Sequence, residues 1–108
     1  MAEKNITMVR GDTLSFGLEL VNEELLDTAY FSCKTSYSAE EYAFQKSLED
    51  GITEEDAGIY KIRVAPEDTA DLDPGTYYYD FEIGANGDKF TIIWGTLTLL
   101  PDVTVEGG

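Results

Sequence analysis

Short segments in which apolar and polar residues alternate follow one another along most of the chain. In the segment 13–20, every second residue is a large apolar one, and these are Leu14, Phe16, Leu18 and Leu20. A period of two is typical of a strand that buries one face and exposes the other. We expect further strands at 4–9, 28–35, 42–49, 60–64, 76–83 and 89–100, which turn-forming residues divide at intervals of about ten residues. The sequence therefore predicts an all-β sandwich or barrel.

The strand at 76–83 has the strongest alternation, the strand at 89–100 is the longest, and Asn86-Gly87 lies between them. Asn-Gly tolerates the positive φ angles of a tight hairpin turn, so we expect the two strands to pair. Gly95 is expected to mark a bulge, which leaves open whether Ile93 or Trp94 faces the core. The segment 66–72 predicts one short helical turn, because proline suits a first helical position and acidic residues follow it.

The chain has 108 residues, so we expect one domain over 1–108, with 101–108 as an exit segment. With 22 acidic and 7 basic residues the net charge is −15. Such a chain repels nucleic-acid phosphates and anionic lipid, which argues against both as partners. No apolar run has the length of a membrane span, and the first residues lack the pattern of a secretion signal.

The sequence offers little for catalysis. It has no histidine, the commonest general base, and its single cysteine, Cys33, excludes an intrachain disulfide. Cys33 lies in phase with Ala29 and Phe31, so we expect it in the core. The acidic pairs and runs, at 54–56 and at 71–73, lack the ligand number of a calcium loop and are interpreted as solvated. We therefore expect no enzymatic activity, no cofactor and no metal site.

Two short matches have simple explanations. Arg10-Gly11-Asp12 spells an integrin-binding tripeptide, but glycine and aspartate are ordinary turn residues. Asn5-Ile6-Thr7 matches a glycosylation sequon, which means little without a secretion signal.

Two segments share the form Asp-x-Gly-x-Tyr, at 56–60 and at 73–77. This form is typical of the tyrosine corner of immunoglobulin-like domains, in which a tyrosine near the start of a late strand bonds back to the preceding turn. We assign the corner to Asp73, Gly75 and Tyr77, with the Tyr77 hydroxyl bonded to backbone within 71–75. Tyr79 stands where an antibody domain has its second cysteine, so the disulfide signature is absent. The expected fold is an immunoglobulin-like antiparallel β-sandwich of about seven strands with one short helical turn.

The ordered set of these features resembles the small immunoglobulin-like domains of tailed bacteriophages, such as the N-terminal domain of phage baseplate upper proteins. The resemblance covers about residues 8–104. It is carried by Arg10-Gly11-Asp12-Thr13, Gly58-x-Tyr60-x-Ile62, Pro66-Glu67-Asp68-Thr69, Leu72-x-Pro74-Gly75-x-Tyr77-x-Tyr79-Asp80-x-Glu82-Ile83 and the segment 95–104. It implies a non-enzymatic structural module of the tail, baseplate or capsid, made in the bacterial cytoplasm and incorporated into the virion. Its partners would be other virion proteins or a second copy of the chain.

Aromatic and large apolar residues give the best indication of a working surface. Tyr30 and Tyr78 are expected to leave the core, together with Ile93 or Trp94 according to the bulge, and we interpret Tyr30, Tyr78, Ile93 and Trp94 as candidate interface anchors. Two alternatives remain open at this point. The same aromatics suit glycan stacking in a carbohydrate-binding or adhesion domain, and a secreted calcium-dependent adhesion domain is the second alternative.

Overall fold

The computed structural model describes residues 2–19, 26–56 and 58–103; the expected inward position of Leu20 and the exit residues 104–108 lie outside this part. The elements are β1 (Ala2–Glu3), β2 (Ile6–Val9), β3 (Leu14–Glu19), β4 (Thr28–Lys34), β5 (Phe44–Leu48), β6 (Gly51–Asp56), β7 (Ile59–Val64), α1 (Pro66–Thr69), β8 (Gly75–Ala85) and β9 (Asp88–Leu100).

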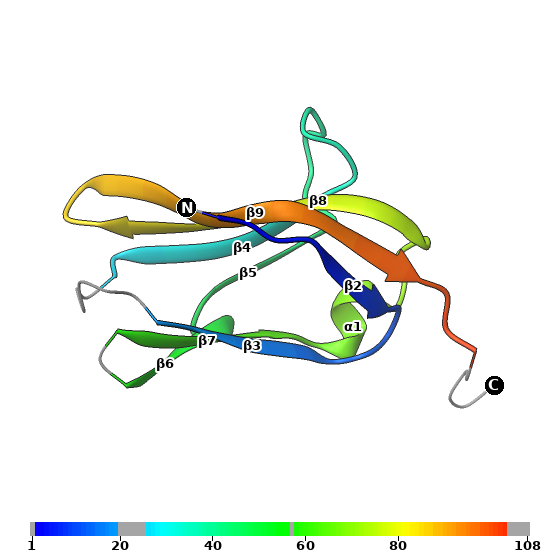
Figure 1. Ribbon diagram of the computed structural model, residues 1–108, viewed down its shortest axis with the longest axis horizontal. Helices are drawn as coiled ribbons and strands as arrows, with labels where there is room; N and C mark the ends of the chain where they lie inside the picture. The colour runs from blue at the N-terminus through cyan, green and yellow to red at the C-terminus, as the bar shows by residue number, and fades with distance from the viewer. Residues whose placement is uncertain (1, 20–25, 57, 104–108) are drawn as a thin grey trace.

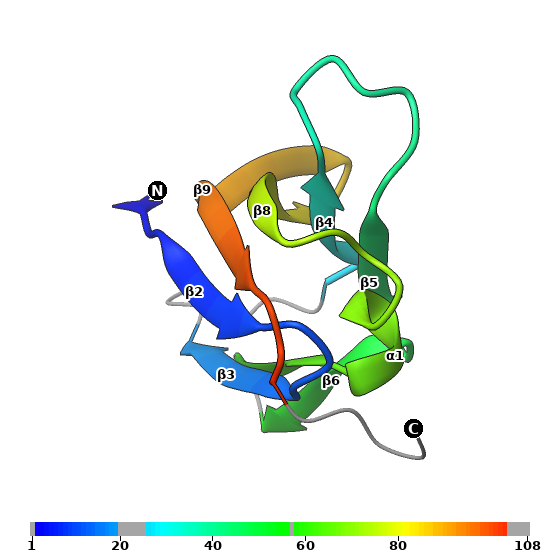
Figure 2. The ribbon, with the colours of Figure 1, turned by 90° about the vertical axis from the view of Figure 1, so that its right-hand side faces the viewer.

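The strands form one hydrogen-bonded sheet that folds over on itself into two layers (Figure 1). Its order is β1-β9-β8-β4-β5-β6-β7-β3, and β2 also pairs with β9. One layer contains β9, β8 and β4, and the other contains β3, β7 and β6. The two layers are connected by a short parallel pairing of β5 with β6. Figure 2 shows β5 descending from one layer toward the other on the right of the view. The predicted all-β, immunoglobulin-like sandwich is confirmed.

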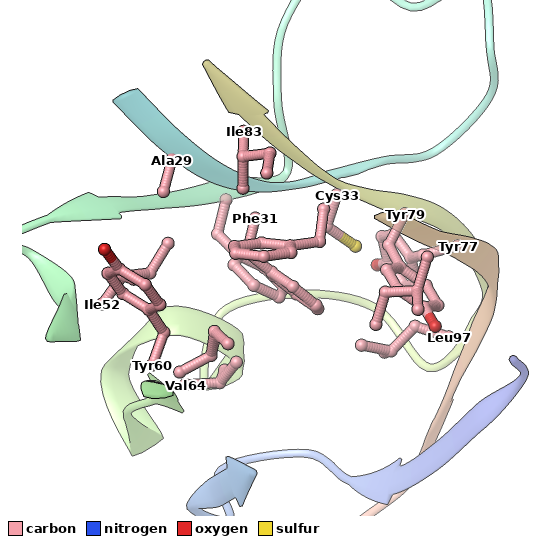
Figure 3. Close-up of a cluster of buried hydrophobic side chains, with 14 of the residues drawn as sticks. Ala29, Phe31, Cys33, Ile52, Tyr60, Val64, Tyr77, Tyr79, Ile83 and Leu97 are labelled. Atoms are coloured by element: carbon pink, nitrogen blue, oxygen red, sulfur yellow. The ribbon is translucent and has the colours of Figure 1, made fainter. Parts of the chain in front are cut away.

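The core lies between the layers, where the alternating residues point inward (Figure 3). The inward positions that a period of two predicts on three strands, β4, β7 and β8, are confirmed as buried: Ala29, Phe31, Cys33, Tyr60, Ile62, Val64, Tyr77, Tyr79, Phe81 and Ile83. Phe31 is at the centre, with its ring centroid 5.1 Å from that of Tyr79 and 5.8 Å from that of Phe16. The contact of Phe31 of β4 with Phe16 of β3 joins the two layers. Cys33 is fully buried and unpaired, as predicted.

The bulge in the β8–β9 hairpin lies elsewhere than predicted. Asn86 and Gly87 both have positive φ, which confirms the tight turn. The register shifts between Phe81, which pairs with Ile93, and Glu82, which pairs with Thr91. The extra residue is therefore Ile92 and not Gly95, whose pairing with Tyr79 is regular.

Gly95 has a different role, which is close packing against the Lys4–Asn5 link between β1 and β2. A Cβ atom at Gly95 would collide with the Lys4 carbonyl oxygen and lie 2.9 Å from the Asn5 side-chain oxygen. That carbonyl accepts a hydrogen bond from the Tyr79 hydroxyl, and the Asn5 oxygen accepts bonds of 3.1 Å from the backbone N–H and hydroxyl of Thr96. The link is thus fastened to β9, and Asn5 of the sequon has a structural role.

Two further sequence interpretations were wrong. The strand expected at 42–49 starts later than predicted, because β5 begins at Phe44, and the side chain of Tyr42 before it is 50% exposed. No strand was expected at 51–56, yet the acidic segment at 54–56 belongs to β6. β6 has one buried apolar residue, Ile52, and its second half is exposed and acidic. The alternation of apolar and polar residues by which a strand is predicted is therefore absent there.

Segments that carry the family resemblance meet at one end of the sandwich. The Arg10 Nε atom donates to Asp102 Oδ1 at 2.8 Å, and its guanidinium also donates to the Leu72 carbonyl oxygen at 3.2 Å. The Gly11 N–H donates to the buried Thr69 hydroxyl at 2.8 Å. The Arg10-Gly11-Asp12 turn is therefore a structural joint between β2, α1 and the segment after β9.

Candidate functional site

The outward face of the β9–β8–β4–β5 layer brings three expected interface residues together. Strand pairing places Trp94 beside Asp80, and Asp80 beside Ser32. Tyr78 lies two residues before Asp80 on β8, and Tyr30 lies two residues before Ser32 on β4. Because side chains two apart share a face of a strand, these three aromatic residues surround a polar centre.

The segment 35–43 between β4 and β5 forms a wall beside this face. It rises well above the layer in Figure 1. Its Tyr37 ring lies 4.8 Å from the Tyr78 ring, centroid to centroid. The Lys34 ammonium lies 5.3 Å from the centre of the Tyr42 ring, a cation–π geometry. These contacts connect the wall to the outer rows of β4 and β8.

Between the wall and the sheet is an open hollow with a volume of about 800 Å³. Its aromatic lining comprises Tyr30, Tyr37, Tyr42, Tyr78 and Trp94, with a small contribution from Tyr79. Its polar lining comprises Ser32, Lys34, Ser36, Gln45, Asp80, Glu82, Lys89 and Thr91. The Gln45 amide donates to the Ser32 hydroxyl at 3.0 Å, which fixes both side chains on the floor. We call this region the aromatic hollow.

The charges in the aromatic hollow differ from those of the chain as a whole. The lining contains two acidic residues, Asp80 and Glu82, and two basic residues, Lys34 and Lys89. Their charges therefore balance within the hollow, although the chain as a whole has a net charge of −15. Burial raises the pKa of Asp80 above its ordinary value, the neighbouring Glu82 carboxylate raises it further, and Lys34 partly offsets both. The centre of the hollow is therefore already partly desolvated before any ligand arrives.

Ile93 does not belong to this surface, although the sequence placed it there. It is 8% exposed and lies in the core, because the bulge at Ile92 returns Ile93 to the inner face and Trp94 to the outer one. Trp94 is 38% exposed. Sequence reasoning missed Tyr37 and Tyr42, whose positions depend on the path of a segment without strand periodicity.

Tyr77 occupies the position expected for a tyrosine corner. It is buried, and its hydroxyl donates to the Asp73 carbonyl oxygen at 2.6 Å. Gly75, between them, has a φ of 148°, a value that favours glycine. The bond connects the start of β8 to the turn before it, on the strand that carries Tyr78 and Asp80.

Two kinds of site were also sought in the described ranges 2–19, 26–56 and 58–103. No three Asp, Glu or Cys side chains there gather as ligands for a metal ion. Within the same ranges, no helix has the length and apolar character needed to cross a membrane.

Comparison with known proteins finds similarity at the level of fold. The chain is similar to swine CD8aa, solved as a homodimer, with a TM-score of 0.49 and 11% identity over 92% of this chain and 93% of that chain. It is also similar to the extracellular domain of the voltage-gated sodium channel beta4 subunit, solved as parallel homodimers, with a TM-score of 0.49 and 12% identity over 94% of this chain and 93% of that chain. No family model and no curated protein matches the sequence. Identities this low carry no information about function.

Proposed function

We propose that the protein is a non-enzymatic association module that binds another protein through the aromatic hollow. The observation that carries this proposal is the gathering of Tyr30, Tyr37, Tyr78 and Trp94 around one open concave surface. Tyrosine and tryptophan anchors are the residues that contribute most to protein interfaces when a partner covers them. The local balance of charge supports the proposal, because a strongly acidic surface would oppose close approach of an acidic partner.

We further propose that the partner is a component of a phage particle, either another virion protein or a second copy of the chain. The protein would then be a tail, baseplate or capsid-associated structural module, made in the bacterial cytoplasm and incorporated into the virion. This finer proposal rests on the sequence resemblance described above. The rigid joint around Arg10 and the strands beside the aromatic hollow suit a module that presents a preformed surface.

The test compares outward-facing substitutions on the two layers. Tyr78→Ser and Trp94→Ser remove anchors of the aromatic hollow, whereas Ile59→Ser removes an apolar side chain of matched exposure, 37% against 38% for Trp94, from the opposite layer. We expect the first two variants to lose self-association in sedimentation, or incorporation into particles, while Ile59→Ser keeps both. Normal assembly of folded Tyr78→Ser and Trp94→Ser proteins would contradict the proposal.

A carbohydrate-binding domain is the second candidate, and one observation favours it. The floor of the aromatic hollow carries hydrogen-bonding groups of Ser32, Gln45 and Asp80 between aromatic walls, which suits a sugar ring stacked on one side and bonded at its edge. Under this alternative a monomeric protein binds glycans, and Asp80→Asn with Gln45→Ala abolishes that binding. Glycan-array binding by a protein that sediments as a monomer would favour this candidate over the association module.

A further inference from the structure

The edge strand β3 has a backbone side that no described strand covers. It stands at one end of the sheet order and pairs only with β7, in register from Leu14 with Val64 to Glu19 with Ile59. The preceding strands β1 and β2 pair with β9 in the other layer. The free edge of β3 therefore presents main-chain donors and acceptors in the pattern that an added strand requires.

The core is less covered along this edge than elsewhere. The inward side chains of β3, Leu14, Phe16 and Leu18, remain half-buried, whereas those of its neighbour β7 are at most 2% exposed. Ile6 of β2, which lies on the same side of the molecule in Figure 2, is also only partly buried. A strand placed beside β3 would cover these side chains with its own inward residues.

The outer side of the edge carries an unusual local charge. Ser15 and Gly17 of β3 pair with Arg63 and Lys61 of β7. Both basic side chains are exposed, and neither forms an ion pair with any residue in the described part of the chain. Because serine and glycine are small, the two cations are accessible from the β3 edge, and acidic side chains of an added strand can reach them.

We propose that the β3 edge binds an extended segment of a partner protein in which apolar and acidic residues alternate. Its backbone would continue the sheet, its apolar residues would pack on Leu14, Phe16 and Leu18, and its acidic residues would lie over Ser15 and Gly17 toward Lys61 and Arg63. This is strand addition, in which main-chain bonds give affinity and alternate side chains give specificity. The exposed Glu19 lies two residues beyond Gly17 on the same outer face of β3, so the acidic residues of the added strand belong opposite Ser15 and Gly17 and not opposite Glu19. At physiological ionic strength charges more than about 8 Å apart are screened, so the more distant acidic residues of the chain have less influence on this edge.

The probe is a synthetic peptide of about eight residues that alternates valine and glutamate, matched with one that alternates valine and lysine. We expect the glutamate peptide to bind and to slow amide hydrogen exchange in residues 14–19. The charge-reversed variant Lys61→Glu/Arg63→Glu should bind this peptide about tenfold more weakly, equal to about 1.4 kcal/mol, and should prefer the lysine peptide. Both substituted positions are exposed, so the fold is retained.

Two controls separate this surface from the aromatic hollow. Lys89→Glu makes the same kind of charge change on the other layer and should leave peptide binding unchanged. Trp94→Ser should likewise leave it unchanged, even if it abolishes assembly. Equal binding of both peptides, no binding, or protection outside β3 would overturn the proposal. Protection of β3 amides in concentrated protein without peptide would also overturn it, because the occupant would then be a second copy.

Discussion

Replacing Tyr77 by phenylalanine removes one hydroxyl group and keeps the ring that packs in the core. The lost interaction is the bond from that hydroxyl to the Asp73 carbonyl oxygen, 2.6 Å long. Asp73 is exposed, so water can reach its carbonyl oxygen once the tyrosine hydroxyl is gone. The cost is then that of one hydrogen bond without a stranded buried acceptor, about 1 kcal/mol within a usual range of about 0.5–1.5 kcal/mol.

Such a loss lowers the melting temperature of a domain of this size by about 4–8 °C. It should also lower the urea midpoint without changing the slope of the transition, because the surface exposed on unfolding is the same. Tyr60→Phe is the matched control, since Tyr60 ends the other Asp-x-Gly-x-Tyr segment and its hydroxyl donates to the exposed Glu54 carboxylate at 3.3 Å. This longer bond predicts a smaller loss. A neutral Tyr77→Phe together with a costly Tyr60→Phe would refute the assignment of the corner.

Three other predictions follow from the packing and the titrating groups. Gly95→Ala should destabilise the fold by about 1–3 kcal/mol in urea unfolding, because the new methyl group meets the Lys4 carbonyl oxygen. The control Gly17→Ala should be near neutral, since its Cβ would lie at an ordinary contact distance of 3.6 Å from the Tyr60 carbonyl oxygen. Equal effects of the two substitutions would refute the role of Gly95. Burial raises the pKa of Cys33 from 9.0 to about 12, so the native protein should resist a bulky thiol reagent. The contribution of the buried thiol to stability should be complete below about pH 9 and fall as the pH rises toward 12. Labelling of the native protein at the rate of the denatured chain would contradict this. The hydrogen bond from Arg10 lowers the pKa of Asp102 below its ordinary value of 3.8. The pair should therefore stabilise the fold above pH 3.8 and lose this effect as the pH falls through the lowered pKa. The stability of Asp102→Asn should depend less on pH in this acidic range, and an unchanged pH profile would contradict the prediction.

The strands could be predicted where apolar and polar residues alternate strongly, and not where a strand buries only one apolar side chain. The alternation at 76–83 predicted β8, because each second residue is large and apolar, and the structure buries Tyr77, Tyr79 and Phe81. β6 was missed because its exposed acidic half carries no apolar phase. Gly95 was assigned to a bulge because glycine in a strand has two common meanings, a bulge or a close approach of another backbone. Only the path of the Lys4–Asn5 link decides between them.

The candidate site was half predictable for the same reason. Tyr30, Tyr78 and Trp94 lie on strands, where outward phase follows from a period of two once the bulge is placed. Tyr37 and Tyr42 lie in the segment 35–43, whose direction depends on contacts with Tyr78 and Lys34 and not on a local repeat. The hollow itself is a product of that segment and the sheet together, so no pattern within either one indicates it.

Trp94 is the single tryptophan of the chain, and its fluorescence reports directly on the aromatic hollow. The most direct test of the proposed working surface is the quenching of this fluorescence by acrylamide, a neutral quencher that the charge of −15 does not repel. The measurement compares the dilute protein with the same protein after association, with complex formation established by sedimentation. We predict ready quenching in the dilute protein, where Trp94 is 38% exposed, and strong protection in the complex. Unchanged quenching in a complex that sedimentation shows to have formed would contradict the account, because the partner would then lie on another surface.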